Sequence, residues 1–302
     1  MTEDVFLADL LGRLPAADSS IIVPPGDDCA ALDLGGEGLL LLAVDQVVGD
    51  KHYLPEDTSP EAVGRKLLAR NLSDVAAMGG TPTHCLVASA TSPGCGGDWL
   101  ARFFDGILEM ANAHGVQMVG GDLACAPSDN VASLTILGRV LRERVLLRSG
   151  ARPGDVLLAT GTFGESFVTE HHLFFEPRCR EGVWLADSGI PTAMMDVSDG
   201  LLLDASRVCK ASGVSLLLDC PSIPRRRAET TLSQALSDGE DYELLLAVPS
   251  HAAAKLLADW PFDDVLLTRI GRFVERGDGL VLDEGGQVLP VEGYDHLDGT
   301  RP

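Results

Sequence analysis

The chain has 302 residues, enough for two domains or one large domain with a substantial hydrophobic core. Apolar residues make up 45% of it, a composition that excludes a disordered chain. The formal net charge is −22, from 23 Lys and Arg against 45 Asp and Glu, and this lack of basic surface argues against binding to nucleic acid or to anionic membranes.

The first half of the chain is expected to alternate strands with two helices. Ser59 followed by Pro60 is a strong helix start, and Gly79-Gly80 is a matching stop, so a helix is predicted from there to about residue 78. The second predicted helix covers 98–114, and strands are predicted over 39–44, 84–90, 116–119 and 131–140. This alternation favours an α/β or α+β layered fold.

A turn-rich stretch over 148–155 is the best candidate for a domain boundary. It divides the chain into an N-terminal domain, 1–147, and a C-terminal domain, 148–302. The second half then has predicted strands over 156–160, 214–219, 242–248 and 265–274 and predicted helices over 201–211 and 250–259. The region up to about residue 190 shows little periodicity, so no element is assigned there.

Six short acidic segments stand at the ends of apolar runs, most of them beside glycines. They are 26–28, Asp45, 71–74, 120–122, 196–200 and 238–241. Taken singly, an exposed Asp-Gly pair is most often only a turn. Carboxylates that gather in one cleft repel one another unless hard cations lie between them, so the set as a whole indicates magnesium with phosphate groups.

Several other kinds of site are excluded by missing motifs. The chain has no Gly-x-x-x-x-Gly-Lys-(Ser/Thr) loop, no Gly-x-Gly-x-x-Gly after a strand and no Gly-x-Ser-x-Gly elbow. His171 and His172 are adjacent and would point to different faces, which does not suit zinc. A hard-oxygen site for metal-dependent phosphoryl transfer remains, because this chemistry needs mainly positioning and charge neutralisation.

The seven cysteines are scattered and form no Cys-x-x-Cys pair, which favours reduced thiols over a disulfide framework. The N-terminus lacks the basic start and apolar stretch of a signal peptide. No apolar run approaches the roughly 20 residues needed to span a bilayer. A soluble, cytoplasmic protein is therefore expected.

Seven collinear motifs closely resemble those of the thiamine-monophosphate kinases, and they cover nearly the whole chain. They are Gly-Asp-Asp-Cys-Ala (26–30), Asn-Leu-Ser-Asp-Val-Ala-Ala-Met-Gly (71–79), Gly-Gly-Asp (120–122), Arg-Ser-Gly-Ala-Arg-Pro-Gly-Asp (148–155), Asp-Val-Ser-Asp-Gly-Leu (196–201), Ala-Leu-Ser-Asp-Gly-Glu-Asp-Tyr-Glu-Leu (235–244) and Gly-Tyr-Asp-His (293–296). The resemblance implies a two-domain fold like that of aminoimidazole ribonucleotide synthetase, with a homodimer formed through the N-terminal sheet and a C-terminal domain covering the nucleotide cleft. It also implies direct transfer of the ATP γ-phosphate to thiamine monophosphate.

The resemblance assigns roles to individual positions. It implies magnesium ligands at Asp28, Asp45, Asp74, Asp122, Asp196 and Asp199, of which Asp196 and Asp199 are the catalytic pair bridging metal and phosphates. It implies ATP contacts at Gly121, Asp122, Arg148 and Ser198, and contacts to the thiamine phosphate at His52, Glu240 and Tyr294.

The chain also departs from the family pattern. A Ser/Thr-Thr-Asp sequence is usual before the substrate loop, but here it is Ala43-Val44-Asp45, which puts the number of magnesium ions in question. The loop 48–53 carries a charge pair, Asp50 and Lys51, not usual in the family, and the regions 165–190 and 221–235 are shorter than usual.

Two alternatives stay open at this point. One is another ATP-using enzyme of the same superfamily, such as a purine-biosynthesis or selenophosphate synthetase, although the latter needs a Cys or selenocysteine that the first 20 residues lack. The other is a nucleotide-binding protein that has lost turnover, a reading that all six acidic segments argue against.

Overall fold

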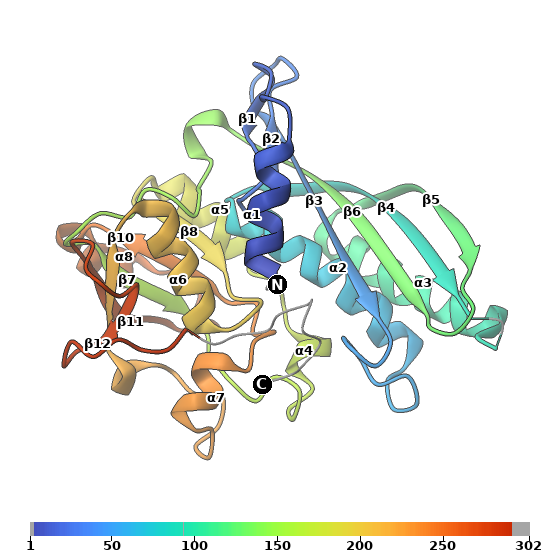
Figure 1. Cartoon of the computed structure of the whole chain (residues 1–302). Helices are drawn as coiled ribbons and strands as arrows, with labels where there is room; N and C mark the ends of the chain where they lie inside the picture. Colours follow the sequence, from blue (N-terminus) through green and yellow to red (C-terminus); the bar gives the residue numbers. More distant parts are fainter. Residues whose placement is uncertain (1–2, 93, 292–302) are drawn as a thin grey trace.

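The computed structural model describes residues 3–92 and 94–291, which form two six-stranded sheets with a long helix between them (Figure 1). The first sheet has the order β1-β2-β3-β6-β4-β5, with bounds Ile21–Val23, Ala30–Leu32, Leu39–Val48, Val131–Val140, Thr81–Thr91 and Gln117–Cys125. The second has the order β12-β9-β11-β7-β10-β8, with bounds Val281–Asp283, Ser215–Leu218, Leu267–Val274, Val156–Thr160, Leu244–Val248 and Ala193–Asp196. The predicted two-domain α/β fold is thereby confirmed.

The helices differ in where they lie: α2 and α3 pack together beside the first sheet, α5, α6 and α8 cover the two faces of the second, and α1 is exposed. Their bounds are α1 Glu3–Arg13, α2 Pro60–Ala77, α3 Gly96–His114, α4 His171–Phe174, α5 Cys179–Ser188, α6 Leu201–Ser212, α7 Leu232–Ser237 and α8 Ser250–Asp259, with single 3-10 turns at Arg142–Arg144 and Cys220–Ser222.

Helix α2 is the central element of the fold because both halves of the chain pack against it. The predicted start is confirmed: the Ser59 side chain accepts a hydrogen bond from the Ala62 N–H, and Pro60 is the first helical residue. The chain leaves the helix at Gly79, whose φ of 69° is in the left-handed region. Nearly every side chain of α2 is buried, so the polar groups near its C-terminal end lie inside the molecule.

Two glycines allow α2 and α3 to cross closely. A Cβ on Gly64 would lie 1.9 Å from the Phe103 carbonyl oxygen, and one on Gly106 would lie 2.0 Å from the Glu61 carbonyl oxygen. Only glycine fits at such a backbone approach. Helix α2 also packs on β3 and β6 of the first sheet.

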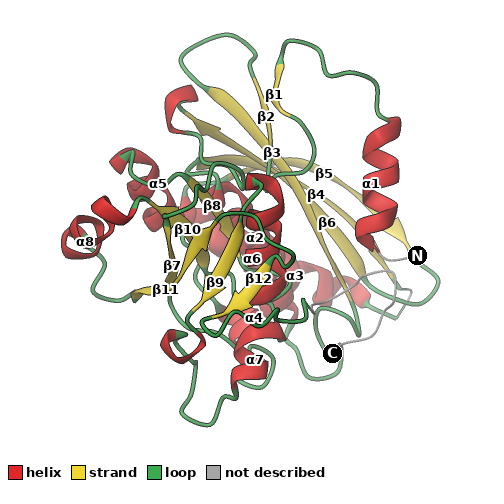
Figure 2. Cartoon of the chain, turned by 60° about the vertical axis from the view of Figure 1, so that its left-hand side comes forward, coloured by secondary structure: helices red, strands yellow, loops and turns green. Residues whose placement is uncertain are grey.

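Strands β7, β8 and β10 of the second sheet are buried along their whole length, because helices cover both of its faces (Figure 2). Alternate residues of these strands pack against α6 on one side and against α5 and α8 on the other. Strand β8 runs toward α2 and ends at Asp196. The sheet therefore delivers this carboxylate to the polar end of α2.

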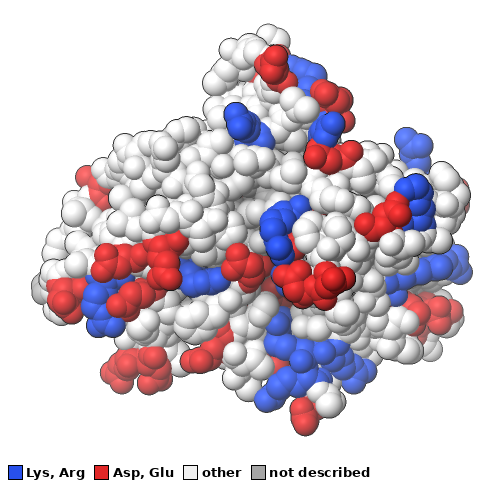
Figure 3. Space-filling view, turned by 180° about the vertical axis from the view of Figure 1, so that it is seen from behind, with Lys and Arg blue, Asp and Glu red and all other residues white. Residues whose placement is uncertain are grey.

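Over the face drawn in Figure 3, groups of Asp and Glu lie beside groups of Lys and Arg, so that charge of both signs is spread across it. Among the described residues, none of the helices has the length and apolar character that a bilayer crossing needs. All seven cysteines lie in this part of the chain, and none of them is in a disulfide.

Candidate active site

Three of the six predicted metal ligands meet at the junction of the two halves. Asp28 comes from the loop between β1 and β2, Asp74 from the last turns of α2, and Asp196 from the end of β8. One carboxylate oxygen of each lies within 4.8 Å of the others. Residues that are 168 positions apart in sequence thus form one cluster, the carboxylate trio.

The electrostatics of the trio call for a cation. Burial, followed by the carboxylates of Asp45 and Asp196, raises the pKa of Asp74 well above its ordinary value. Burial and then Asp28 raise the pKa of Asp196 in the same way. The Oδ2 atom of Asp28 is buried and has no hydrogen-bond partner among the described residues. Such a group is costly unless a ligand supplies the missing charge.

Hydrogen bonds fix the trio in place. The Ser73 hydroxyl donates to Asp196 Oδ2 over 2.5 Å. Arg148 donates from Nε to Asp28 Oδ1 over 3.0 Å, and its backbone N–H donates to both oxygens of Asp27. Arg148, which sequence similarity predicts to bind ATP, therefore lies at the edge of the trio with its guanidinium already oriented by a carboxylate.

Asp199 lies on the loop that follows β8 and is held by a second ion pair. Arg207 Nη1 donates to Asp199 Oδ2 and to Asp204 Oδ1, each over 2.6 Å. Asp204 Oδ2 in turn accepts the backbone N–H groups of Ser198 and Asp199 at 3.0 Å. Asp199 is not in the trio, although it stands only three residues from Asp196. Asp204 and Arg207 thus brace the loop that carries Asp199.

The loop 238–242 is fastened to the Asp199 loop by backbone hydrogen bonds. The Glu240 N–H donates to the Ser198 carbonyl over 2.7 Å, and the Tyr242 N–H donates to the Val197 carbonyl over 2.8 Å. Glu240 and Tyr242 have φ values of 55° and 51°. Left-handed conformations at residues other than glycine are strained and gather at functional sites.

Glu240 and His52, both predicted to contact the substrate, are joined by a buried lysine. Lys66 of α2 pairs with Glu240 and donates to the His52 carbonyl over 2.6 Å, and its side chain is 0% exposed. His52 Nδ1 accepts the Val48 N–H over 3.1 Å. Burial raises the pKa of Glu240, but Lys66 and then Arg70 outweigh it and lower the pKa below its ordinary value.

Asp45 lies beside the trio but is paired with an arginine. Arg70 Nη2 donates to Asp45 Oδ1 over 3.3 Å, and Arg70 Nε lies 3.2 Å from Oδ2. The Asp45 N–H donates to the Asn71 side chain over 3.1 Å, which ties β3 to α2. Val44, by contrast, is 65% exposed and faces the opposite side of the sheet, since neighbouring strand residues alternate in direction.

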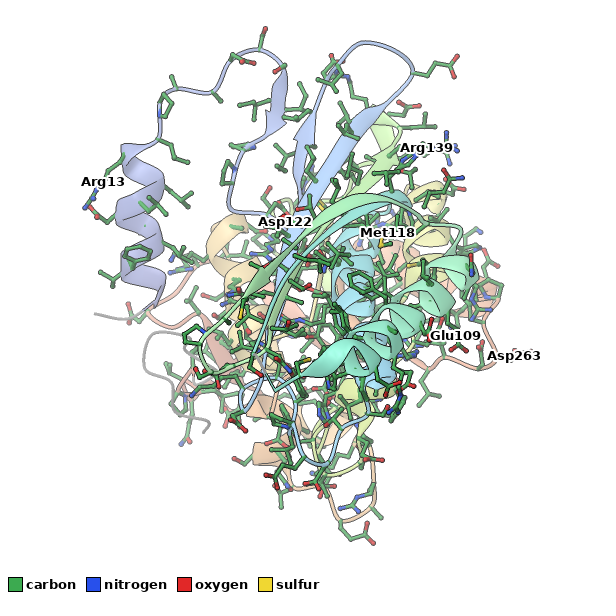
Figure 4. All side chains as sticks on the ribbon, turned by 90° about the vertical axis from the view of Figure 1, so that its right-hand side faces the viewer. Arg13, Glu109, Met118, Asp122, Arg139 and Asp263 are labelled. Atoms are coloured by element: carbon green, nitrogen blue, oxygen red, sulfur yellow. The ribbon has the colours of Figure 1, made fainter. Side chains whose placement is uncertain are left out.

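Gly121 and Asp122 are not brought to the trio within one chain. They lie on the edge strand β5, whose residues are all exposed (Asp122 is labelled in Figure 4), and two strands, β6 and β4, separate β5 from β3 (Figure 1). Three strand spacings amount to about 14 Å. Register places Gly121 in line with Asp45, so Asp122 faces the other side of the sheet.

Gly121 also has a structural reason to be glycine: a Cβ there would lie 2.0 Å from the Val87 carbonyl oxygen. The ATP and metal roles of both residues stay predictions, as does that of Tyr294, which lies outside the described residues.

The comparisons with known proteins agree with this geometry. Residues 26–140 match the model of the AIR synthase related protein N-terminal domain, and residues 156–283 match that of the C-terminal domain. The thiamine-monophosphate kinase of Escherichia coli strain K12 is 34% identical over 96% of this chain and 97% of its own length. That of Rhodopirellula baltica is 35% identical over 91% of this chain and 90% of its own.

This chain belongs to the thiamine-monophosphate kinase family. A solved structure described as AaThiL complexed with AMPPCP and TMP has a TM-score of 0.84, with 26% identity over 98% of this chain and 97% of that one. The thiamine-monophosphate kinase structure from Stenotrophomonas maltophilia has a TM-score of 0.76, with 29% identity over 95% of this chain and 96% of that one.

Several residues of the site received no role of their own in the sequence analysis, although Asp27 and Ser73 lie within the acidic segments 26–28 and 71–74. They are Asp27, Lys66, Arg70, Ser73, Asp204 and Arg207. Lys66, Arg70 and Ser73 are on α2, and their spacing from Asp74 puts them within the same buried stretch of helix. A buried cation on a core helix was the available signal, because Lys and Arg are almost never fully buried without a partner.

Magnesium should stabilise the protein more as the pH rises. The pKa values of Asp74 and Asp196 are raised in the folded, metal-free protein, so this state keeps protons that the unfolded chain releases above about pH 4. The stability that these two groups contribute is therefore lost as the pH rises through their folded pKa values. A divalent cation bound at the trio would replace those protons. We expect the melting temperature in Mg²⁺ to exceed that in EDTA by roughly 5 °C at about pH 8 and by far less at about pH 5. Scanning fluorimetry across this range measures the difference, and a gap independent of pH would contradict it.

Proposed function

We propose that this chain transfers the γ-phosphate of ATP to thiamine monophosphate, with magnesium, and releases ADP and thiamine diphosphate. The observation that carries the proposal is the carboxylate trio at the junction of the two domains in a chain that belongs to the thiamine-monophosphate kinase family. The solved structure with the TM-score of 0.84 is a complex with AMPPCP and TMP. AMPPCP is a nucleotide analogue, and TMP corresponds to the acceptor that we propose for this chain.

The residues present suit magnesium. Asp28, Asp74 and Asp196 offer carboxylate oxygens, the donors that this ion prefers. One of these oxygens, Oδ2 of Asp28, is buried and has no hydrogen-bond partner among the described residues. We assign these three residues as ligands, with Asp199 beside them. When bound, the ion neutralises the phosphate oxygens on which negative charge gathers during transfer.

The protein's own groups orient the two substrates. Arg148, fixed by Asp27 and Asp28, presents a planar guanidinium that can contact two phosphate oxygens. Ser198 lies on the braced loop after β8, two residues from Asp196, and we assign it to the nucleotide. His52 and Glu240, linked through Lys66, are the residues that we assign to the thiamine phosphate. Transfer is direct, so that no residue carries the phosphoryl group.

An assay with the purified protein tests the proposal. ATP, Mg²⁺ and thiamine monophosphate should give ADP and thiamine diphosphate in equal amounts, as measured by chromatography. ATP binding without thiamine diphosphate would indicate a nucleotide-binding protein without turnover. Phosphorylation that requires a different acceptor would indicate another enzyme of the superfamily.

We also infer that the chain forms a homodimer through its first sheet. Register aligns Val44 with Leu86 across Thr135, and the two apolar side chains are 65% and 40% exposed. The outer edge of β5 has no strand beside it among the described residues, and Val119 and Leu123 there are 56% and 61% exposed. An exposed apolar face next to an open strand edge suits a second copy. Because Asp122 lies on this face, its predicted metal role requires the partner.

Leu86→Glu should convert the dimer to a monomer, since it places a charge in the middle of the apolar face. Light scattering after gel filtration measures the mass. Leu257→Glu on α8, a leucine of similar exposure at 37%, is the matched control and should leave the mass unchanged. A Leu86→Glu protein that stays dimeric places the interface elsewhere.

The cytosol is the compartment we propose. Its reducing conditions suit seven cysteines that include the exposed Cys125, and ATP is available there.

A further inference from the structure

Arg70 carries a charged side chain that lies inside the protein, where arginine is rare unless it is paired. It is on α2 one turn before Asp74, and the residue is 8% exposed. Its guanidinium donates to the Gln46 carbonyl over 2.8 Å, which fixes it against β3. An arginine stays protonated in proteins, so the site contains a permanent positive charge.

The partner of this charge is Asp45. Both carboxylate oxygens face the guanidinium, with Nη2 3.3 Å from Oδ1 and Nε 3.2 Å from Oδ2. Asp45 is close enough to Asp74 to raise the pKa of that residue, yet it is absent from the group of oxygens that lie within 4.8 Å of one another. Asp45 therefore belongs to the same charged region as the trio but is already neutralised.

The missing hydroxyl at Val44 does not account for this difference. Val44 and Asp45 are adjacent on β3 and point to opposite faces, and Val44 is 65% exposed. Within one chain, a hydroxyl at this position would not reach the Asp45 carboxylate. The residue that bears on Asp45 is Arg70, which comes from a different element.

We infer that the Arg70 guanidinium replaces a divalent cation at Asp45, so that the metal-binding capacity of one chain is confined to the trio and its neighbour Asp199. The inference rests on the proposed function for the role of the trio, and it assigns Arg70 as a positioning residue that supplies fixed charge beside the phosphates. A guanidinium that faces both oxygens repels a second cation there and so weakens its binding, whereas Asp28 keeps one oxygen that has no partner among the described residues.

Binding of Mn²⁺ alone, followed by electron paramagnetic resonance, tests the inference without turnover. Arg70→Met frees Asp45 and should bind one Mn²⁺ per chain more than the wild type. The double variant Arg70→Met with Asp45→Asn should lose that extra ion, and it also guards against misfolding, since it removes both charges together. Arg65→Met, on the same helix and paired with the exposed Glu176, is the control and should match the wild type.

Two results would overturn the inference. One is an Arg70→Met protein, folded by circular dichroism, that binds no more Mn²⁺ than the wild type. The other is an Asp45→Asn single variant that binds one ion fewer than the wild type, because Asp45 would then hold a metal beside Arg70. If the variants bind Mn²⁺ as expected but the wild-type protein makes no thiamine diphosphate, the proposed function is refuted and this inference stands.

Discussion

Asp196→Asn is expected to lower kcat by about a thousandfold, which corresponds to about 4 kcal/mol of transition-state stabilisation. The substitution keeps the size of the side chain and an oxygen for the Ser73 hydroxyl, but it removes one of the three charges that face the phosphates. The rate of thiamine diphosphate formation at saturating substrates measures the effect. Because burial and Asp28 raise the pKa of Asp196, the same variant should melt at a higher temperature than the wild type in EDTA at neutral pH.

The matched control for this variant is Asp219→Asn. Asp219 also follows a strand of the second sheet, but within the described part of the chain its carboxylate accepts only the Ser222 hydroxyl, and it is not in the trio. It should keep kcat within about twofold of the wild type. An Asp196→Asn enzyme with near-normal kcat would mean that the trio has no part in the reaction.

Lys66→Met is expected to destabilise the protein by about 3–5 kcal/mol, because it leaves the Glu240 carboxylate buried without its main partner. The His52 carbonyl would lose its donor at the same time. Denaturant unfolding followed by circular dichroism measures the free energy of unfolding. Any folded enzyme that remains should have a raised KM for thiamine monophosphate, since Lys66 orients both residues assigned to that substrate.

The double variant Lys66→Met with Glu240→Leu separates charge from packing. It removes both members of the pair and should be more stable than Lys66→Met alone, since no uncompensated charge is left. Arg102→Met breaks the exposed pair between Arg102 of α3 and Glu61 of α2, the helix that also carries Lys66. It should lower the free energy of unfolding by less than about 1 kcal/mol. A Lys66→Met protein as stable as the Arg102→Met protein would show that the Lys66 pair carries little of the stability.

Local signals in the sequence were enough to predict the elements with strong end signals. The start of α2 at Ser59-Pro60, strand β6 and helix α8 have the predicted bounds because caps and apolar periodicity act over a few residues. Helix α1 and the short strands β1 and β2 were not predicted, and neither were α4 and α5. Strands of three residues and the four-residue helix α4 carry too little periodicity to be predicted. Helices α1 and α5 have 11 and 10 residues, so shortness does not explain why they were missed.

The sequence predicted only part of the carboxylate cluster, because the order of strands in a sheet cannot be read from the order of strands in the chain. Asp28, Asp74 and Asp196 converge because Asp74 is on α2, Asp196 ends a strand that packs on α2, and the loop between β1 and β2 brings Asp28 to them. Asp122 does not, because β5 lies at the far edge of the sheet although it follows α3 directly in the chain. The pairing of Arg70 with Asp45 joins a helix to a strand that precedes it, and no local pattern reveals such a contact.

The most direct test of the account follows the phosphorus atom itself. In a single turnover with ATP labelled at the γ-phosphate, thiamine monophosphate and Mg²⁺, the label should pass entirely to thiamine diphosphate, and none should remain on the protein at any time point. Label in inorganic phosphate, or on the protein after quenching in acid or alkali, would contradict direct transfer to thiamine monophosphate at the carboxylate trio.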